Sequence, residues 1–183
     1  MSTENHPDFE TVLQLYHKRI YNLIYRLLGN FDEAADLTQE TFVNAYKAYP
    51  RFRGATQAVY PWLCQIAVNS CKNKYKEMDR RGSREAFSLD GHLGEDSDIS
   101  MEFGDDSANP EGIFERQELE SRVLEAMQEL PSEFRIVVVL RDMQGLSYKE
   151  ISDATGLTLD LVKIRLYRGR EILRRRLAPY ITD

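Results

Sequence analysis

Two clusters of basic, amide and aromatic side chains have the residue types and spacing needed to bind nucleic acid. The first spans residues 163–176, where seven basic residues and one acidic residue leave a net charge of +6. In a helix, at about 100° per residue, one face and its flanks would carry a mixed apolar and basic set: Lys163, Ile164, Arg165, Tyr167 and Arg168. In a major groove, apolar side chains can meet thymine methyls while Arg and Lys reach guanine edges or phosphates. The alternative is a helical hairpin with a solvated charged face.

The second cluster lies within residues 62–76 and again falls on one face of a predicted helix. Its members are Trp62, Gln65, Asn69, Lys72, Asn73 and Lys76. A tryptophan at the head of an Asn/Gln/Lys stripe suits stacking on bases and hydrogen bonding to their edges, as in single-strand binders. The alternative interpretation is that Trp62 is a half-buried packing residue beside a hydrated face.

The residues before the first cluster predict a helix-turn-helix. Ser147 and Glu150 have the spacing of a capping box, which satisfies two backbone donors at a helix start. Gly156 is suited to end that helix, and Thr158 to cap the next one. Two helices joined by a turn that contains Gly match the helix-turn-helix pattern.

The second of these helices should pack through its other face. We expect the inward side chains to be Leu159, Val162, Leu166, Gly169, Leu173 and Leu177. Gly169 costs about 1 kcal/mol in helix propensity. Its place on the packed face indicates a close approach to another helix.

Three further helices are predicted in the N-terminal half. The first covers residues 9–27 and ends at Gly29. The second is capped by Asp32 and ends at Pro50, with an inward face of Leu37, Ala45 and Ala48. Elsewhere it presents a polar surface of Asp36, Gln39, Glu40 and Thr41. The third follows a basic loop at residues 51–58.

This third helix is predicted from Pro61 to Arg80, because proline suits the first turn of a helix. Its inward face would hold Leu63, Ala67, Cys71 and Met78, with Cys64 at the edge. Seven residues along one helix separate the two cysteines by about 10.5 Å, which is too far for a disulfide.

The remaining segments complete an all-α chain of two small helical domains, 1–81 and 111–183. Residues 82–110 lack periodicity and are rich in Gly, Ser and Asp, so they are predicted to be a flexible acidic linker. The second domain begins with a helix to Leu130. The run FRIVVVLRDM after Pro131 could be a strand, but a lone strand would have no partner, so we expect a buried helix.

The composition limits the classes of function that the chain can have. The net charge of −6 argues against nucleic acid, but nine acidic residues fall in 85–111, so the rest carries −6 + 9 = +3. Clustered charge sets the local field more than net charge does. No metal-ligand cluster, catalytic set, signal sequence or membrane span is recognisable. We therefore expect a cytoplasmic protein without cofactor, metal or enzymatic activity.

Three long motifs resemble, in order, those of bacterial RNA polymerase sigma factors of the extracytoplasmic-function (ECF) group. DEAADLTQETFVNAYKAYPRF resembles the segment that docks on the β′ clamp helices of core polymerase. PWLCQIAVNSCKNKY resembles the segment that opens and reads the −10 element. LPSEFRIVVVLRDMQGLSYKEISDATGL with VKIRLYRGRE resembles the domain that reads the −35 element.

The resemblance implies roles for particular positions. Core polymerase, through its β′ and β subunits, would be contacted at Asp36, Gln39, Glu40 and Phe42. The −10 element would be read and melted by the 62–76 face, with Asn69 at a flipped base and the 51–58 loop assisting. The −35 element would be read by the first cluster. Promoter DNA, core polymerase and an anti-sigma factor are the implied partners.

Some positions depart from the family pattern. The family commonly has small polar residues where this chain has Leu161 and Ile164, and Ala where it has Gly169. Ile164 removes a hydrogen-bonding group from the groove face, so the −35 sequence cannot be copied from relatives. The acidic linker could mimic nucleic acid inside the polymerase or act only as a solvated tether.

Two other functions compete with the sigma-factor interpretation. One is a stand-alone helix-turn-helix regulator whose N-terminal domain senses or dimerises. The other is a helical adaptor that binds only proteins through its charged faces.

Overall fold

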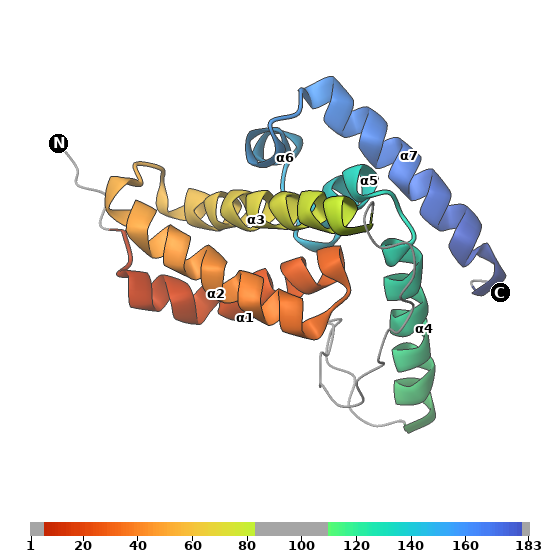
Figure 1. Ribbon diagram of the computed structural model, residues 1–183. Helices are drawn as coiled ribbons and strands as arrows, with labels where there is room; N and C mark the ends of the chain where they lie inside the picture. The colour runs from red at the N-terminus through yellow and green to blue at the C-terminus, as the bar shows by residue number, and fades with distance from the viewer. Residues whose placement is uncertain (1–5, 83–109, 181–183) are drawn as a thin grey trace.

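The N-terminal half is a bundle of three helices (Figure 1). The computed structural model describes residues 6–82 and 110–180, with side chains described from residue 117 in the second part. Helices α1 (Phe9–Leu28), α2 (Phe31–Ala48) and α3 (Val59–Gly82) pack against one another. Short 3-10 turns, η1 (Tyr49–Arg51) and η2 (Thr56–Ala58), join the last two. The predicted linker, apart from its end residues Gly82 and Pro110, lies outside the described residues.

The C-terminal half is also helical. Its elements are α4 (Pro110–Gln128), α5 (Ser132–Val138), η3 (Val139–Met143), α6 (Tyr148–Thr155), α7 (Leu159–Leu177) and η4 (Ala178–Tyr180). The described residues contain no strand, which confirms the all-α prediction and the two helical domains. The run IVVV is helical, as expected, but the chain then widens into a π-helical turn in which the Gln144 N–H donates to the Val139 carbonyl at 3.0 Å.

Three predictions for α2 are wrong. Asn30, not Asp32, caps α2: its side chain accepts from the Glu33 N–H at 3.0 Å. The helix therefore starts two residues earlier than predicted, at Phe31, whose ring packs 4.4 Å from that of Tyr25. Thr41, expected on the polar surface, is fully buried, whereas Ala48, expected inward, is exposed.

The inward face of α3 is buried except at its end. Leu63, Ala67 and Cys71 are fully buried, and so is Cys64, which was expected at the edge. Met78, predicted to face inward, is 47% exposed. The physical reason is that α3 runs past its neighbours, since every residue from Lys76 to its end is exposed. Both cysteines are free thiols, as their spacing requires.

The buried apolar side chains form one cluster that continues from the N-terminal bundle into the C-terminal half. It includes Leu27 of α1, Leu63 of α3, Met127 of α4, Leu140 of η3 and Ile151 of α6. The two halves are therefore packed together in this structure, with α6 against α3 and α4 beside α1 (Figure 1).

Gly169 lies where α7 closely approaches another helix. A Cβ built at this glycine would lie 2.7 Å from Val138 Cγ2 and 3.3 Å from Phe134 Cβ, both on α5. The expected close approach is therefore confirmed, and its partner is α5. The missing side chain lets α7 lie directly on this helix.

We predict that Gly169→Ala lowers the free energy of unfolding by about 1 kcal/mol. Overpacking costs about 1–3 kcal/mol, from which a gain of about 1 kcal/mol in helix propensity is subtracted. Urea unfolding followed by circular dichroism measures the change. Gly82→Ala is the matched control, because nothing lies within 4 Å of a Cβ there. A midpoint raised equally in both variants would contradict the close packing.

Candidate nucleic-acid interfaces

The start of the helix-turn-helix is held by the capping box that the sequence predicts. Ser147 Oγ accepts from the Glu150 N–H at 3.2 Å, and Glu150 Oε2 accepts from the Ser147 N–H at 2.7 Å. These bonds satisfy two of the orphan donors at the start of α6. The first helix of the motif therefore begins at a defined residue.

The turn is equally well defined. Gly156 ends α6 at a φ of +75°, a left-handed conformation that favours glycine. Ser152 Oγ donates to the Leu157 carbonyl at 2.6 Å, and Thr158 Oγ1 accepts from the Leu161 N–H at 3.3 Å. These local bonds set the direction in which α7 leaves the turn.

Helix α7 divides into a packed face and an open face. Val162, Leu166 and Gly169 are buried, while Ile164 is 48% and Tyr167 71% exposed. Of the other predicted inward residues, Leu173 and Leu177 are half-buried. Leu159 was predicted to face inward but is 46% exposed, because it lies in the first turn of α7, ahead of Val162, the first buried residue of the helix.

The outward charge of α7 is smaller than its sequence suggests. The guanidinium of Arg170 forms a two-bond pair with Asp142, including an Nε to Oδ2 distance of 2.9 Å, and this pairing raises its pKa. Three other arginines also pair within the chain: Arg174 and Arg175 with Glu171, and Arg176 with Glu129. Glu171 is already included in the +6 counted from sequence, whereas Asp142 and Glu129 lie outside residues 163–176 and lower this local charge to 6 − 2 = +4.

The residues predicted to enter the major groove differ in their exposure and in their ion pairs. Lys163 and Arg168 are exposed, and Lys163 Nζ lies 3.9 Å from Asp160 Oδ1. Arg165 is half-buried and pairs with Glu133 at 3.1 Å, which ties it to the start of α5. The side chains that project outward are therefore Lys163, Ile164, Tyr167 and Arg168.

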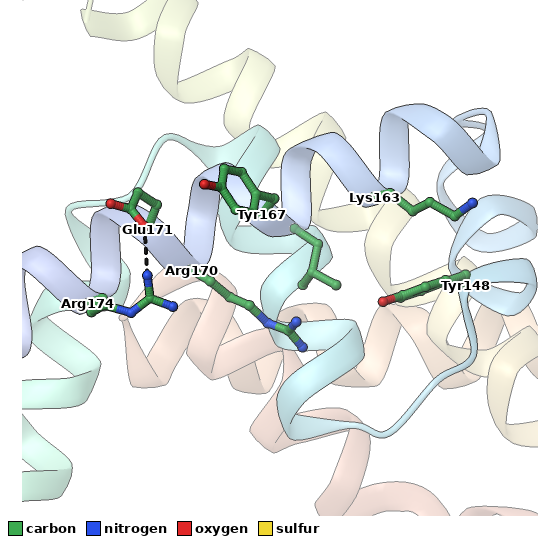
Figure 2. Close-up of a pocket in the computed structure, with 7 residues that line it drawn as sticks. Tyr148, Lys163, Tyr167, Arg170, Glu171 and Arg174 are labelled. Carbon is green, nitrogen blue, oxygen red and sulfur yellow. Dashed lines mark hydrogen bonds and ion pairs between the residues drawn. The ribbon is translucent and has the colours of Figure 1, made fainter.

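A shallow pocket of about 280 Å³ opens on the outward side of α7 (Figure 2). It is lined by Tyr148, Lys163, Leu166, Tyr167, Arg170, Glu171 and Arg174. Tyr148, at the start of α6, was not singled out in the sequence, because only the fold brings it next to α7. The lining combines cations with two aromatic rings, a surface suited to a phosphate backbone and to bases.

The face predicted on α3 is mostly exposed. Gln65, Asn69, Asn73 and Lys76 lie on the surface, and Lys72 is half-buried. Burial, with Arg165 and Lys76 nearby, lowers the pKa of Lys72. Two of these residues bond to α6: Gln65 Nε2 donates to the Asp153 carbonyl at 3.2 Å, and Lys72 Nζ to the Thr155 carbonyl at 2.7 Å.

Trp62 is half-buried in an aromatic cluster at the head of this face. Its ring centroid lies 4.9 Å from that of Phe52 and 6.0 Å from that of Tyr49. Phe52 comes from the basic loop, so Trp62 joins the loop to α3. This placement agrees with the packing alternative and leaves part of the ring accessible.

The polar surface of α2 holds Asp36, Gln39 and Glu40, all exposed. Phe42 is only 6% exposed; its ring lies 5.7 Å from that of His17 and packs in the core. Val43, 51% exposed, and Tyr46, 65% exposed, were missed. They follow Gln39 at helical spacing, which is the sequence signal that could have identified them.

The described residues hold no group of three or more His, Cys, Asp or Glu side chains placed to bind a metal ion. Within the same residues, no helix combines the length and apolar character of a membrane span.

The fold and its helix-turn-helix define the class of all-α, DNA-binding transcription proteins. Residues 12–81 match the family Sigma-70 region 2, and residues 120–173 match Sigma-70, region 4. The RNA polymerase sigma-H factor of Pseudomonas aeruginosa is 32% identical over 184 residues, covering 96% of this chain and 89% of the relative. The ECF RNA polymerase sigma-E factor of Escherichia coli K12 is 31% identical, covering 94% and 88%.

Solved structures agree on the fold. The sigma factor RpoE of Bartonella quintana, solved with the anti-sigma factor NepR, superposes with a TM-score of 0.66 at 22% identity and covers 93% of this chain and 97% of that one. The chain therefore belongs to the ECF group of RNA polymerase sigma factors. It is a transcription initiation factor that binds core RNA polymerase and promoter DNA, and the stand-alone regulator is not favoured.

We predict that Ser147→Ala lowers the free energy of unfolding by about 1 kcal/mol, because the cap bond of α6 is lost. Chemical denaturation measures the change. Ser121→Ala, at an exposed position inside α4, is the matched control and should change stability by less than about 0.5 kcal/mol. Equal effects in the two variants would show that the capping box contributes nothing specific.

Proposed function

We propose that this sigma factor reads promoter DNA with two separate helix faces and binds core polymerase with a third. Residues 1–81 would form the domain that binds polymerase and reads the −10 element, and 111–183 the domain that reads the −35 element. Residues 82–110 would connect them. Initiation would occur in the cytoplasm, with polymerase performing the chemistry and this chain supplying recognition and melting.

The observation that carries the −35 assignment is the open face of α7. Ile164 and Tyr167 are exposed beside Lys163 and Arg168, although a solvated helix gains nothing by exposing apolar groups. In a major groove, Ile164 can contact a thymine methyl and Arg168 a guanine edge. Arg165, held by Glu133, is better placed to support the helix or contact a phosphate than to read a base.

The −10 assignment is supported by the exposed amides of α3. Asn69 and Asn73 can hydrogen bond to base edges, while Lys72 and Lys76 offer cations to phosphates. Flipping a base costs a few kcal/mol, so a stacking surface is needed nearby. The half-exposed ring of Trp62, fixed by its neighbours Phe52 and Tyr49, would supply it.

The polymerase-binding surface is proposed to be the exposed side of α2. Asp36, Gln39 and Glu40 are exposed and polar, and Val43 and Tyr46 extend the surface with apolar area. Such a combination suits a protein partner, since interfaces combine an apolar centre with a polar rim. Phe42 would act indirectly, by packing beneath α2 rather than by touching polymerase.

An anti-sigma factor is a further proposed partner. The similar fold from Bartonella quintana was solved in complex with one. By analogy, such a partner would cover the DNA-binding or polymerase-binding surfaces until a signal releases it.

The central test is reconstitution with core polymerase on a library of promoter fragments. We expect the purified chain to convert core enzyme into one that initiates at a defined subset of promoters, measured by sequencing the transcripts. Tight binding of duplex DNA by the chain alone, with no gain in initiation by core enzyme, would contradict the proposed function.

We predict that Asn69→Ala impairs promoter opening and −10 discrimination while core affinity is unchanged. The loss follows from removing hydrogen bonds to a flipped base. Permanganate footprinting measures opening, and fluorescence anisotropy measures core binding. Gln14→Ala, an exposed amide on α1, is the control. A selective loss of core affinity would place Asn69 on a different surface.

We predict that Arg168→Ala costs about 1–3 kcal/mol of −35 binding and relaxes preference at one base position. A binding series over −35 variants with reconstituted holoenzyme measures both effects. Arg175→Ala, which removes a guanidinium paired with Glu171, should leave base preference unchanged. A uniform loss over all sequences would instead assign Arg168 to a phosphate.

A further inference from the structure

The N-terminal segment, residues 6–8, packs against the loop that leads into α3. The start of α1, the end of α2 and the start of α3 lie at one end of the N-terminal bundle (Figure 1). There the Tyr49 hydroxyl donates to the Pro7 carbonyl at 2.6 Å, across 42 positions of sequence. The ring of His6 lies 5.4 Å from that of Phe52. The chain that enters the first helix is therefore attached to the loop that enters the third.

The N-terminal segment is itself anchored to α1. Asp8 Oδ1 accepts from the Thr11 N–H at 2.7 Å and caps the helix. The ring of Phe9, the first residue of α1, lies 5.3 Å from that of Tyr49. The segment therefore connects the loop to the start of a packed helix.

The ring of Phe52 is where the contacts on the loop side meet. Its centroid lies 4.9 Å from that of Trp62. A Cβ built at Gly54 would lie 2.6 Å from Phe52 Cζ, so the loop backbone passes close to this ring. Arg53 Nη1 donates to the carbonyls of Pro50 and Phe52 at 2.8 and 3.0 Å, which holds the loop in a tight turn. Phe52 thus contacts the N-terminal segment, its own loop and Trp62.

The imidazole of His6 contributes to this arrangement by packing. Its Nδ1 is buried and has no hydrogen-bond partner among the described residues. The ring is tilted by 57° to that of Phe52, a geometry in which aromatic rings attract one another. A phenyl ring at this position would keep the packing and lose no hydrogen bond from Nδ1.

We propose that the N-terminal segment is a positioning element for promoter opening. It holds Phe52, and through Phe52 the ring of Trp62, in the orientation that stacks on a melted base. This proposal rests on the proposed −10 role of Trp62. A base that leaves the duplex needs its stacking partner already in place. Loosening the segment should therefore slow promoter opening while core affinity is unchanged.

The position of the ring can be measured in the free chain, because Trp62 is its only tryptophan. The double variant His6→Ala/Tyr49→Phe detaches the N-terminal segment and leaves Phe52 and Trp62 in the chain. We expect red-shifted tryptophan emission and stronger quenching by acrylamide, with the same helix content by circular dichroism. Tyr21→Phe is the control, since it removes a hydroxyl about 18 Å along α1 from the start of the helix, and it should leave the emission unchanged.

The effect on function is measured with reconstituted holoenzyme, by permanganate footprinting on a promoter identified by the reconstitution. We expect the double variant to open it about tenfold more slowly, given one lost hydrogen bond and one lost ring contact. Affinity for core polymerase and for the −35 element should not change. His6→Phe should open the promoter at the rate of the intact chain, whereas His6→Ala should be slower. Equal rates for these two single variants would overturn the packing role of His6.

Trp62→Ala separates failure of this proposal from failure of the proposed function. If Trp62→Ala slows opening but the double variant changes neither the emission nor the opening rate, the positioning role of the segment is wrong. A double variant that loses core affinity and opening equally would also overturn it, because the segment would then support the whole domain. If Trp62→Ala opens the promoter normally, the proposed −10 role of Trp62 is wrong, and the positioning proposal fails with it.

Discussion

The buried guanidinium of Arg135 joins the two halves at the ends of two helices. From the start of α5 it donates to four oxygens: the carbonyls of Leu27, Gln128 and Leu130 and the side-chain oxygen of Gln128. Leu27 lies at the end of α1, and the other acceptors lie at or just after the end of α4. A cation placed at the carbonyl ends of two helices is favourable because both ends carry partial negative charge.

This arrangement also constrains the interface. No carboxylate is among the hydrogen-bond acceptors of Arg135, and its Nε has no partner among the described residues. The hydroxyl of Tyr75 donates to the same Leu27 carbonyl, and burial raises its pKa. Separating the halves would remove the Leu27 carbonyl while leaving the acceptors of α4 in place.

The two halves expose their proposed DNA faces in different ways. On α7, buried packing against α5 through Gly169 leaves Ile164 and Tyr167 facing solvent. On α3, part of the face is paired with the end of α6. Most of the arginines near the end of α7 are neutralised by Asp142, Glu171 and Glu129. The exposed apolar side chains Ile164 and Tyr167 lie beside the exposed cations Lys163 and Arg168.

The sequence by itself determined the features that depend on neighbours in the chain. The capping box at Ser147, the left-handed Gly156 and the inward face of α7 at Val162 and Leu166 follow from spacing of three or four residues. Most helix ends could be predicted for the same reason, whereas the helical state of IVVV was expected because a lone strand would have no partner. A helical pattern gives the direction of a side chain, but it does not reveal whether a neighbour covers it, which is why Met78 and Leu159 were misplaced.

Only the tertiary structure decided which faces are covered, and by what. The bond from Gln65 to Asp153 joins residues 88 positions apart, and the bond from Arg135 to Leu27 joins residues 108 apart. No local rule links such positions, because their proximity results from burial of a common apolar core. The same packing buried Phe42, exposed Val43 and Tyr46 next to the acidic surface, and placed Tyr148 beside α7. The sequence shows which types of side chain each helix carries. Whether a side chain is accessible to solvent is decided only when the core is assembled.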